Sequence, residues 1–247
     1  MKKIALVTGS TGGIGTAISS KFVSDNYRVI ATYSSTEYYK DSIKWFNQQN
    51  FSEEHVRLFR LDVANTTECL ERLTSLLKEE GCIDIIVNNA GITRDSVFKK
   101  MSAKSWYEVI ETNLNSLFNV IQPLFGSMCD KGMGRIINVS SVNALKGQFG
   151  QANYCAAKAG MIGFSKALAE EGAKFGVTVN VVAPGYTSTP MIKKIKSEIL
   201  ESIKYKIPMK RFANPEEIAN TVSFLASESA AYITGATLSV NGGLYMQ

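Results

Sequence analysis

A tyrosine and a lysine four residues apart form the pair in this sequence whose types and spacing could do acid–base chemistry. Tyr154 and Lys158 lie in Ala152–Phe175, a segment long enough for a helix, and residues four apart in a helix share a face. A free phenol has a pKa of about 10, but a neighbouring ammonium favours the phenolate and lowers that pKa. The pair predicts a tyrosine that exchanges a proton with a bound molecule. Tyr–Lys pairs also occur on the exposed surfaces of many helices, so the pair alone does not identify a catalytic site and further motifs are needed.

A glycine-rich turn near the start of the chain could hold a phosphate group. The expected strand Lys3–Thr8 leads through Gly9, Gly13 and Gly15 into an expected helix, Ile14–Asn26. Gly9 permits a tight turn, Gly13 lets backbone amides approach a pyrophosphate, and Gly15 lets the helix pack closely. The helix N-terminus adds unpaired N–H groups and a favourable dipole. Alone, such a turn can be purely structural; its place after the first strand favours dinucleotide binding.

The elements that must position these residues follow from short apolar runs that alternate with longer segments. Most runs are rich in Val and Ile and lack polar alternation, which is typical of strands buried on both faces. The alternation predicts an α/β fold: a single-domain, Rossmann-type, doubly wound parallel sheet of about seven strands with helices on both faces. The expected strands are Lys3–Thr8, Arg28–Tyr33, Val56–Asp62, Ile83–Asn88, Gly134–Ser140, Val177–Ala183 and Thr237–Val240.

The segment after the sixth expected strand breaks this rhythm. Tyr186–Arg211 separates that strand from Asn214-Pro215-Glu216-Glu217, which is typical of a helix start. An insertion after the carboxyl end of a strand lies where ligands bind in such sheets. The sequence therefore predicts one dinucleotide-binding and catalytic domain over residues 1–247, with a substrate lid around 186–211.

Composition and charge argue against several other classes of protein. With 45% hydrophobic and 20% charged residues, the chain is neither disordered nor a coiled coil. The net charge of +5 is mild and the basic residues are scattered, so no nucleic-acid partner is expected. The only histidine is His55 and no two of the four cysteines have CxxC spacing, so no metal site is expected.

The cysteines and the apolar runs also bear on the compartment. The first apolar run is too short for a signal peptide, and no run is long enough to span a bilayer. Four cysteines in a chain of this length do not suggest a disulfide framework. Reduced thiols, a cytoplasmic location and no membrane partner are expected.

The glycine spacing Thr8-Gly9-xxx-Gly13-Ile14-Gly15 differs from the GxGxxG of the larger dehydrogenases and resembles that of the short-chain dehydrogenase/reductase family. Further motifs that resemble the family follow in its order along the chain. They are Asn88-Asn89-Ala90-Gly91, Asn113, Ser141, Tyr154-x-x-x-Lys158, Pro184-Gly185 and Asn241-Gly242-Gly243. One such motif could be chance, but the ordered set is specific, and by it the chain is identified as a member of this family.

The resemblance implies hydride transfer between a nicotinamide dinucleotide and a carbonyl or alcohol. Tyr154 would give its proton to the carbonyl oxygen while hydride arrives at the carbon, and Lys158 would hold the cofactor ribose. Ser141 would hydrogen-bond the substrate oxygen and stabilise developing charge, whereas its neighbour Ser140 would end a strand. Asn113 would hold a water near Lys158 in a proton relay. A non-catalytic dinucleotide sensor on this fold should lack the tyrosine or the lysine.

The end of the second expected strand bears on the choice of cofactor. An enzyme that prefers NAD normally has an acid there, but this strand is followed by Ser34-Ser35-Thr36, with Glu37 only later. NADPH/NADP is therefore expected, with these hydroxyls and Lys40 as donors to the 2′-phosphate, although Gly12 stands where many NADPH-using relatives carry a basic residue. The expected cofactor-binding residues are Gly9, Gly13, Ile14, Gly15, Ser34, Ser35, Asp62, Val63, Asn89, Ala90, Gly91, Tyr154, Lys158, Pro184, Gly185, Thr187 and Thr189.

Two branches of the family are similar to this chain: the 3-oxoacyl-acyl-carrier-protein reductases of fatty acid synthesis and the acetoacetyl-CoA reductases of polyhydroxyalkanoate synthesis. The segment Lys146–Gln151 resembles the second branch. It implies NADPH-dependent reduction of a short 3-oxoacyl thioester, acetoacetyl-CoA to 3-hydroxybutyryl-CoA, by a homotetramer. The glutamines would hold the thioester and the aromatic ring would narrow the pocket. The expected substrate-binding residues are Ser141, Gln148, Phe149, Gln151, Tyr154 and Tyr186.

The identity of the acyl carrier depends on charged surface positions. Carrier-protein reductases resemble one another in two arginines, and the matching positions here are Gly132 and Phe175, with Lys131 and Lys174 beside them. Lid lysines are natural partners for the phosphates of coenzyme A, although each could equally be a solvated residue. They are Lys193, Lys194 and Lys196. Coenzyme A is the expected carrier, and acyl carrier protein remains the alternative.

Overall fold

The computed structural model describes residues 2–189 and 197–246, which form one parallel sheet covered by helices. The strands lie in the order β3-β2-β1-β4-β5-β6-β7, and each neighbouring pair is parallel. The predicted Rossmann-type sheet of seven strands is confirmed, and the strand ends differ from the expected ranges by no more than two residues. The strands are β1 (Ile4–Val7), β2 (Arg28–Tyr33), β3 (Val56–Arg60), β4 (Ile85–Asn88), β5 (Gly134–Val139), β6 (Val177–Pro184) and β7 (Thr237–Val240).

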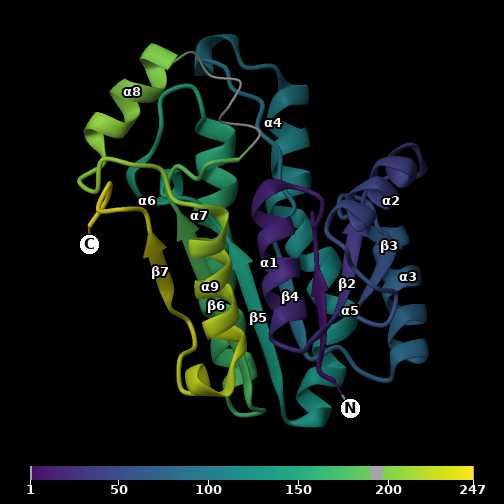
Figure 1. Ribbon diagram of the computed structural model, residues 1–247. Coiled ribbons are helices and arrows are strands. Elements are labelled where there is room, and N and C mark those ends of the chain that lie inside the picture. The colour runs from purple at the N-terminus through teal and green to yellow at the C-terminus, as the bar shows by residue number, and fades with distance from the viewer. Residues whose placement is uncertain (1, 190–196, 247) are drawn as a thin grey trace.

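Helices cover both faces of the sheet, and Figure 1 shows α1 and α9 crossing in front of the strands. One apolar core lies between the sheet and α1 (Gly13–Ser24), α2 (Tyr39–Gln48) and α9 (Pro215–Ala226). A second core lies between the opposite face and α3 (Thr66–Glu80), α5 (Ser116–Lys131) and α7 (Ala152–Ala173). The remaining α-helices of the described residues are α4 (Ala103–Ile110), α6 (Asn143–Lys146) and α8 (Ser197–Lys206).

Strand β1 shows why the apolar runs lack polar alternation. Ala5 and Val7 pack into the core under α1 and α9, whereas Ile4 and Leu6 pack into the core under α3, α5 and α7. Successive side chains of a strand point to opposite faces, so a strand between two helical layers must be apolar at every position. Burial of each large aliphatic side chain contributes about 1.5–3 kcal/mol.

The helical region between β4 and β5 is divided into three pieces. Helix α4 ends at Ile110, a π-helical segment covers Glu111–Asn115, and α5 begins at Ser116. Single π turns in helices are frequent at functional sites. Here the π turn contains Asn113, which is fully buried.

The expected lid is described in part. Within Tyr186–Arg211, α8 covers Ser197–Lys206, while residues 190–196, and with them Lys193, Lys194 and Lys196, lie outside the described residues. The helix start predicted at Asn214 is confirmed, because α9 begins at Pro215 with a capping box between Asn214 and Glu217. No helix in the described part of the chain is both long and apolar enough to cross a membrane.

Candidate active site

The expected site residues gather at the carboxyl edge of the sheet. The glycine loop follows β1, Asn89 follows β4, Ser141 follows β5 and Gly185 follows β6. The strand order reverses between β1 and β4, and ligands of open α/β sheets bind at such a switch point. Segments from residue 9 to residue 185 of the chain are thereby brought to one end of the molecule (Figure 1).

The structure places Ser141, Tyr154 and Lys158 together. The Tyr154 phenol is hydrogen-bonded to Ser141, and the Lys158 Nζ lies 5.9 Å from the centre of the Tyr154 ring. Lys158 is buried, and its Nζ donates to the Val139 carbonyl oxygen at 2.7 Å. Ser140, by contrast, donates its hydroxyl to the backbone oxygen of Lys158 at 2.8 Å, so it ties the end of β5 to α7.

Burial dominates the electrostatics of this group. It raises the pKa of the Tyr154 phenol above its ordinary value, and the hydrogen bond with Ser141 offsets only part of that effect. Burial also lowers the pKa of Lys158 to about 8. The lowering of the Tyr154 pKa expected from the nearby lysine is therefore not present in this structure. The Lys158 ammonium is directed to the Val139 carbonyl, and the groups that shift the pKa of the phenol do not include it.

Asn113 lies beside Lys158 and ties the loop after β4 to the π turn. Its Oδ1 accepts from the Ile92 N–H and its Nδ2 donates to the Ile92 carbonyl, both at 2.8 Å. A Cβ added to Gly91 would meet the Asn113 Oδ1 at 3.1 Å and the Lys158 Nζ at 3.6 Å. Gly91 therefore has no side chain where these two groups converge, and a Cβ there would crowd the Asn113 Oδ1.

The glycine loop is clamped by the segment after β4. Gly9 has a φ of +63°, and a Cβ there would lie 2.9 Å from the Ala90 Cα. A Cβ on Gly15 would lie only 2.1 Å from the Gly9 carbonyl oxygen. Thr8 Oγ1 accepts from the N–H groups of Asn89 and Ala90, and the Asn89 Nδ2 donates to the carbonyls of Thr8 and Gly9. Gly9 and Gly15 thus allow a close approach of loop, helix and neighbouring strand, while Gly13 and Ile14 form the first turn of α1.

Four of the expected cofactor-binding residues follow the ends of β2 and β3. The Asp62 Oδ1 accepts from the Ala64 N–H at 3.1 Å, and Val63 is buried in the core. Ser34 is exposed, and the Ser35 Oγ is buried without a hydrogen-bond partner within residues 2–189 and 197–246. An unpaired hydroxyl at this position, together with the free N–H groups of the first α1 turn, suits a phosphate-bearing dinucleotide.

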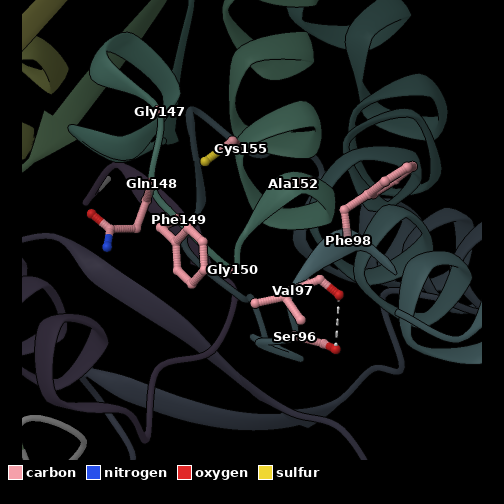
Figure 2. Close-up of a pocket in the computed structure, with 9 residues that line it drawn as sticks. All are labelled: Ser96, Val97, Phe98, Gly147, Gln148, Phe149, Gly150, Ala152 and Cys155. Atoms are coloured by element: carbon pink, nitrogen blue, oxygen red, sulfur yellow. Dashed lines mark hydrogen bonds between the residues drawn. The ribbon is translucent and has the colours of Figure 1, made fainter. Parts of the chain in front are cut away.

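The expected substrate residues do not all line one cavity. A cavity of about 360 Å³ lies between the loops 96–98 and 147–150 and the start of α7, with Gln148, Phe149 and Cys155 in its lining. Figure 2 shows the Phe149 ring beside Gln148, while the Phe98 ring points away from it. Phe149 is 85% exposed, so in this structure the ring does not narrow an enclosed pocket.

Gln151 and Tyr186 lie outside that cavity. Gln151 is bonded to Asn143 and Asp95. Tyr186 lines a second cavity, of about 310 Å³, together with Arg211 and residues 239–243, which are the end of β7 and the turn after it. The four residues taken together as an acyl pocket are thus divided between two cavities and a hydrogen-bonded chain.

The residues after β6 have well-defined positions around the same edge. A Cβ on Gly185 would lie 2.8 Å from the Asn241 Cα, and the Pro184 carbonyl accepts from the Val142 N–H at 2.8 Å. Thr187 is buried and donates to the Gly185 carbonyl at 3.2 Å. Thr189 is the last described residue before 190–196.

Three polar residues at the site are absent from the sequence prediction. Thr8 clamps the glycine loop as described above. Asn153 is fully buried, and its Nδ2 donates to the carbonyls of Arg94 and Ser105 while its Oδ1 accepts from the Tyr154 N–H. Asn143 joins Ser141 to Gln151. Each of them lies within two residues of a predicted site residue: Thr8 of Gly9, Asn153 of Tyr154 and Asn143 of Ser141. This closeness in the sequence is the only signal that could have indicated them.

No group of three or more His, Cys, Asp and Glu side chains in the described part of the chain is arranged to hold a metal ion. The polar groups of the site are amides, hydroxyls, a phenol and an ammonium. They can bind phosphates, ribose hydroxyls and a carbonyl oxygen, and they can exchange a proton with that oxygen.

Comparison with known proteins agrees with this chemistry. A family model described as "Enoyl-(Acyl carrier protein) reductase" matches residues 9–245. An acetoacetyl-CoA reductase of Acinetobacter sp. is 51% identical over 99% of this chain and 98% of its own length. An acetoacetyl-CoA reductase of Allochromatium vinosum is 47% identical over the whole of both chains. A 3-oxoacyl-acyl-carrier-protein reductase of Salmonella typhimurium is 44% identical over 99% of this chain and 98% of its own.

The fold and these relatives place the chain among the oxidoreductases that use a nicotinamide dinucleotide. Within that class it belongs to the short-chain dehydrogenase/reductase family.

Proposed function

We propose that this enzyme reduces a short 3-oxoacyl thioester, acetoacetyl-CoA above all, to the 3-hydroxyacyl thioester with NADPH. The observation that carries the reaction type is the group formed by Ser141, Tyr154 and the buried Lys158 at the carboxyl edge of the sheet. The observation that supports the substrate is the full-length similarity to acetoacetyl-CoA reductases. The identity is 51% for the protein of Acinetobacter sp. and 46% for that of Rhizobium meliloti.

A nicotinamide dinucleotide held at the glycine loop would supply the hydride, and the side chains would supply the proton and the orientation. Tyr154 holds its proton at neutral pH, because burial raises the pKa of its phenol, and is therefore ready to protonate the carbonyl oxygen. Ser141 donates a hydrogen bond to the same oxygen and stabilises the charge that develops there. Lys158, protonated below a pKa of about 8, holds the ribose hydroxyls.

NADPH as the cofactor is supported by the end of β2. Ser34, Ser35 and Thr36 follow Tyr33 without a carboxylate to repel a 2′-phosphate. The unpaired Ser35 Oγ offers a donor there. Rates with NADPH and with NADH at equal concentration test this choice. An advantage of at least tenfold in kcat/KM for NADPH is expected, and equal values would contradict it.

Coenzyme A as the carrier is supported by lysines near the substrate loop. The Lys146 Nζ donates to the Gln148 Oε1 at 2.8 Å and to the Gly147 carbonyl at 3.0 Å. Partial burial lowers the pKa of Lys146, and the charge of Lys206 at the end of α8 adds to this effect. Neither lysine forms an ion pair with a described residue. Uncompensated ammonium groups at this edge suit the phosphates of coenzyme A.

The two positions where carrier-protein reductases have arginines lie elsewhere. Gly132 follows α5 directly before β5, and Phe175 follows α7 directly before β6, so both are at the amino edge of the sheet. Both positions therefore lie at the opposite edge of the sheet from Tyr154 of the same chain. Lys131, next to Gly132, forms an ion pair with Asp84. The case for coenzyme A therefore rests on the relatives and the loop 146–151 more than on the missing arginines.

A direct competition between carriers tests the proposal. The values of kcat/KM for acetoacetyl-CoA and for acetoacetyl-acyl-carrier-protein are measured with NADPH at equal ionic strength. A clear advantage for acetoacetyl-CoA, weakening as salt is raised, is expected because exposed charge pairs are screened. An advantage for the carrier-protein substrate would assign the enzyme to fatty acid synthesis, the function of the Salmonella relative's branch.

A further inference from the structure

A series of hydrogen bonds, through the backbone N–H and the side chain of Asn143 and the side chain of Gln151, joins the proposed catalytic Ser141 to the solvent-facing Asp95. The backbone N–H of Asn143 donates to the Ser141 Oγ at 3.1 Å, and the Asn143 Nδ2 donates to the Gln151 Oε1 at 3.0 Å. The Gln151 Nε2 in turn donates to the Asp95 Oδ2 at 2.9 Å. Three separate segments of the carboxyl edge, after β4, after β5 and before α7, are thereby connected.

Asp95, at the solvent-exposed end of this series of hydrogen bonds, determines which side-chain groups donate and which accept. An ionised carboxylate only accepts hydrogen bonds, so Gln151 must present its NH₂ group to Asp95. The amide oxygen of Gln151 is then left to face Asn143, which must present its own NH₂ group. As a result the Asn143 Oδ1 is buried without a hydrogen-bond partner among the described residues. Such an atom destabilises the folded protein, so packing alone does not account for the asparagine.

The inner end of this series of hydrogen bonds determines what Ser141 can do. Its Oγ accepts from the Asn143 backbone N–H. With this acceptor position occupied, the hydroxyl hydrogen is directed to the other side, where the Tyr154 phenol lies and where a substrate oxygen would bind. A serine that stabilises developing negative charge must donate in that direction.

We infer that Asn143 is a positioning residue for the proposed reduction: its side chain holds Gln151 in one amide orientation, with Asp95 setting the direction, while its backbone N–H occupies an acceptor position of Ser141. This inference rests on the proposed function, because Ser141 and Gln151 act on the substrate of that reaction. Asn143 itself acts through these two residues.

Reversing the direction of the hydrogen bonds between Asn143, Gln151 and Asp95 tests the inference. In Asn143→Asp a carboxylate faces the Gln151 Oε1, so Gln151 must turn and lose its bond to Asp95. An asparagine at position 95 can donate or accept, so the Asp95→Asn background lets the whole series run the opposite way. We expect Asn143→Asp to lower kcat/KM about tenfold in the wild-type background, the scale of one lost hydrogen bond. In the Asp95→Asn background the same substitution should lower it less than about threefold.

The comparison is a double-mutant cycle, so it separates positioning from a general structural role. Equal losses in both backgrounds would overturn the inference. Asn220→Asp, which makes the same chemical change at an exposed site on α9, controls for the added charge. Thermal unfolding and NADPH binding, followed by fluorescence, show that each variant is folded. Should Asn143→Asp not fold, Asn143→Ala is compared with and without Gln151→Ala, and its effect must disappear when Gln151 is absent.

The proposed function and this inference fail in different ways. If the wild-type enzyme does not reduce acetoacetyl-CoA, the proposed function is wrong, and the cycle is measured with ethyl acetoacetate, a ketone ester without a carrier. If the wild-type enzyme reduces acetoacetyl-CoA but Asp95→Asn does not relieve the Asn143→Asp defect, only the positioning role is wrong.

Discussion

Replacing Lys158 with methionine should increase stability and abolish activity, and the gain in stability should depend on pH. Burial lowers the pKa of Lys158 from an ordinary value of 10.5 to about 8. A tenfold change in proton affinity corresponds to about 1.4 kcal/mol, so holding the ammonium in the folded state costs about 3 kcal/mol. The side chain of methionine has a similar length and no charge. The bond to the Val139 carbonyl is lost in the variant, which offsets part of the gain at every pH.

The sign follows from the protons bound in each state. Between about pH 8 and 10.5 the unfolded chain keeps the Lys158 proton and the folded protein has released it, so the wild-type protein gains stability as pH rises through this range. Below about pH 8 the destabilisation is present in full, and above about pH 10.5 it is absent. The methionine variant lacks this dependence of the unfolding free energy on pH.

Urea unfolding of both proteins at pH 7.5 and at pH 10 measures the effect. The free energy of unfolding of the wild type relative to Lys158→Met should rise by about 2–3 kcal/mol between the two pH values, with unchanged m-values. At about 2–4 °C for each kcal/mol, the relative melting temperature should shift by about 4–12 °C. Lys78→Met, at an exposed position of α3, is the control and should show no such change. An equal stability difference at both pH values would refute the assignment of a desolvated ammonium to Lys158.

Three further substitutions test the other parts of the site. Tyr154→Phe should bind NADPH normally and lower turnover by two orders of magnitude or more, measured by NADPH oxidation; near-normal turnover would remove Tyr154 from the mechanism. Gly15→Ala should weaken NADPH binding at least tenfold in a fluorescence titration, because its Cβ would lie 2.1 Å from the Gly9 oxygen, whereas Gly163→Ala, with open space around it, should not. Ser34→Asp should lower the ratio of NADPH to NADH efficiency at least tenfold, because a carboxylate there repels the 2′-phosphate; an unchanged ratio would contradict this.

The fold could be predicted from the sequence because its signals are local. Each central strand is apolar on both faces and each connection has the length of a helix, so the strand order follows the general rules for parallel sheets. The π turn at Glu111–Asn115 could not be predicted in this way. Within this turn the Asn113 side chain bonds to the backbone of Ile92, 21 residues earlier in the chain. A helical pattern does not record a contact with so distant a segment.

Site residues could be predicted where the reaction requires a particular side chain. They could not be predicted where the side chain only holds another loop in place. Tyr154 and Lys158 are conspicuous because their spacing already suggests a proton transfer. Asn143 and Asn153 act on backbone groups and amides of other loops, and nothing in their sequence surroundings indicates those partners. The raised pKa of Tyr154 in the protein without ligands could not be predicted either, because the spacing to Lys158 shows that the two residues are close but not that the phenol is desolvated.

Burial of the tyrosine and the lysine has one consequence for the chemistry. It raises the pKa of Tyr154 and lowers the pKa of Lys158, so it disfavours the phenolate–ammonium pair in the protein without ligands. At neutral pH the lysine still holds its proton, and the phenol holds its own as well. A proton donor for a carbonyl oxygen must be protonated before the hydride arrives, so this resting state is the one that reduction requires. Oxidation of the alcohol would need the phenolate first, and only a further positive charge near Tyr154, such as that of an oxidised nicotinamide ring, would make that state accessible. Burial of this edge of the sheet thus destabilises the charged Lys158 and also keeps Tyr154 protonated, as the proposed reduction requires.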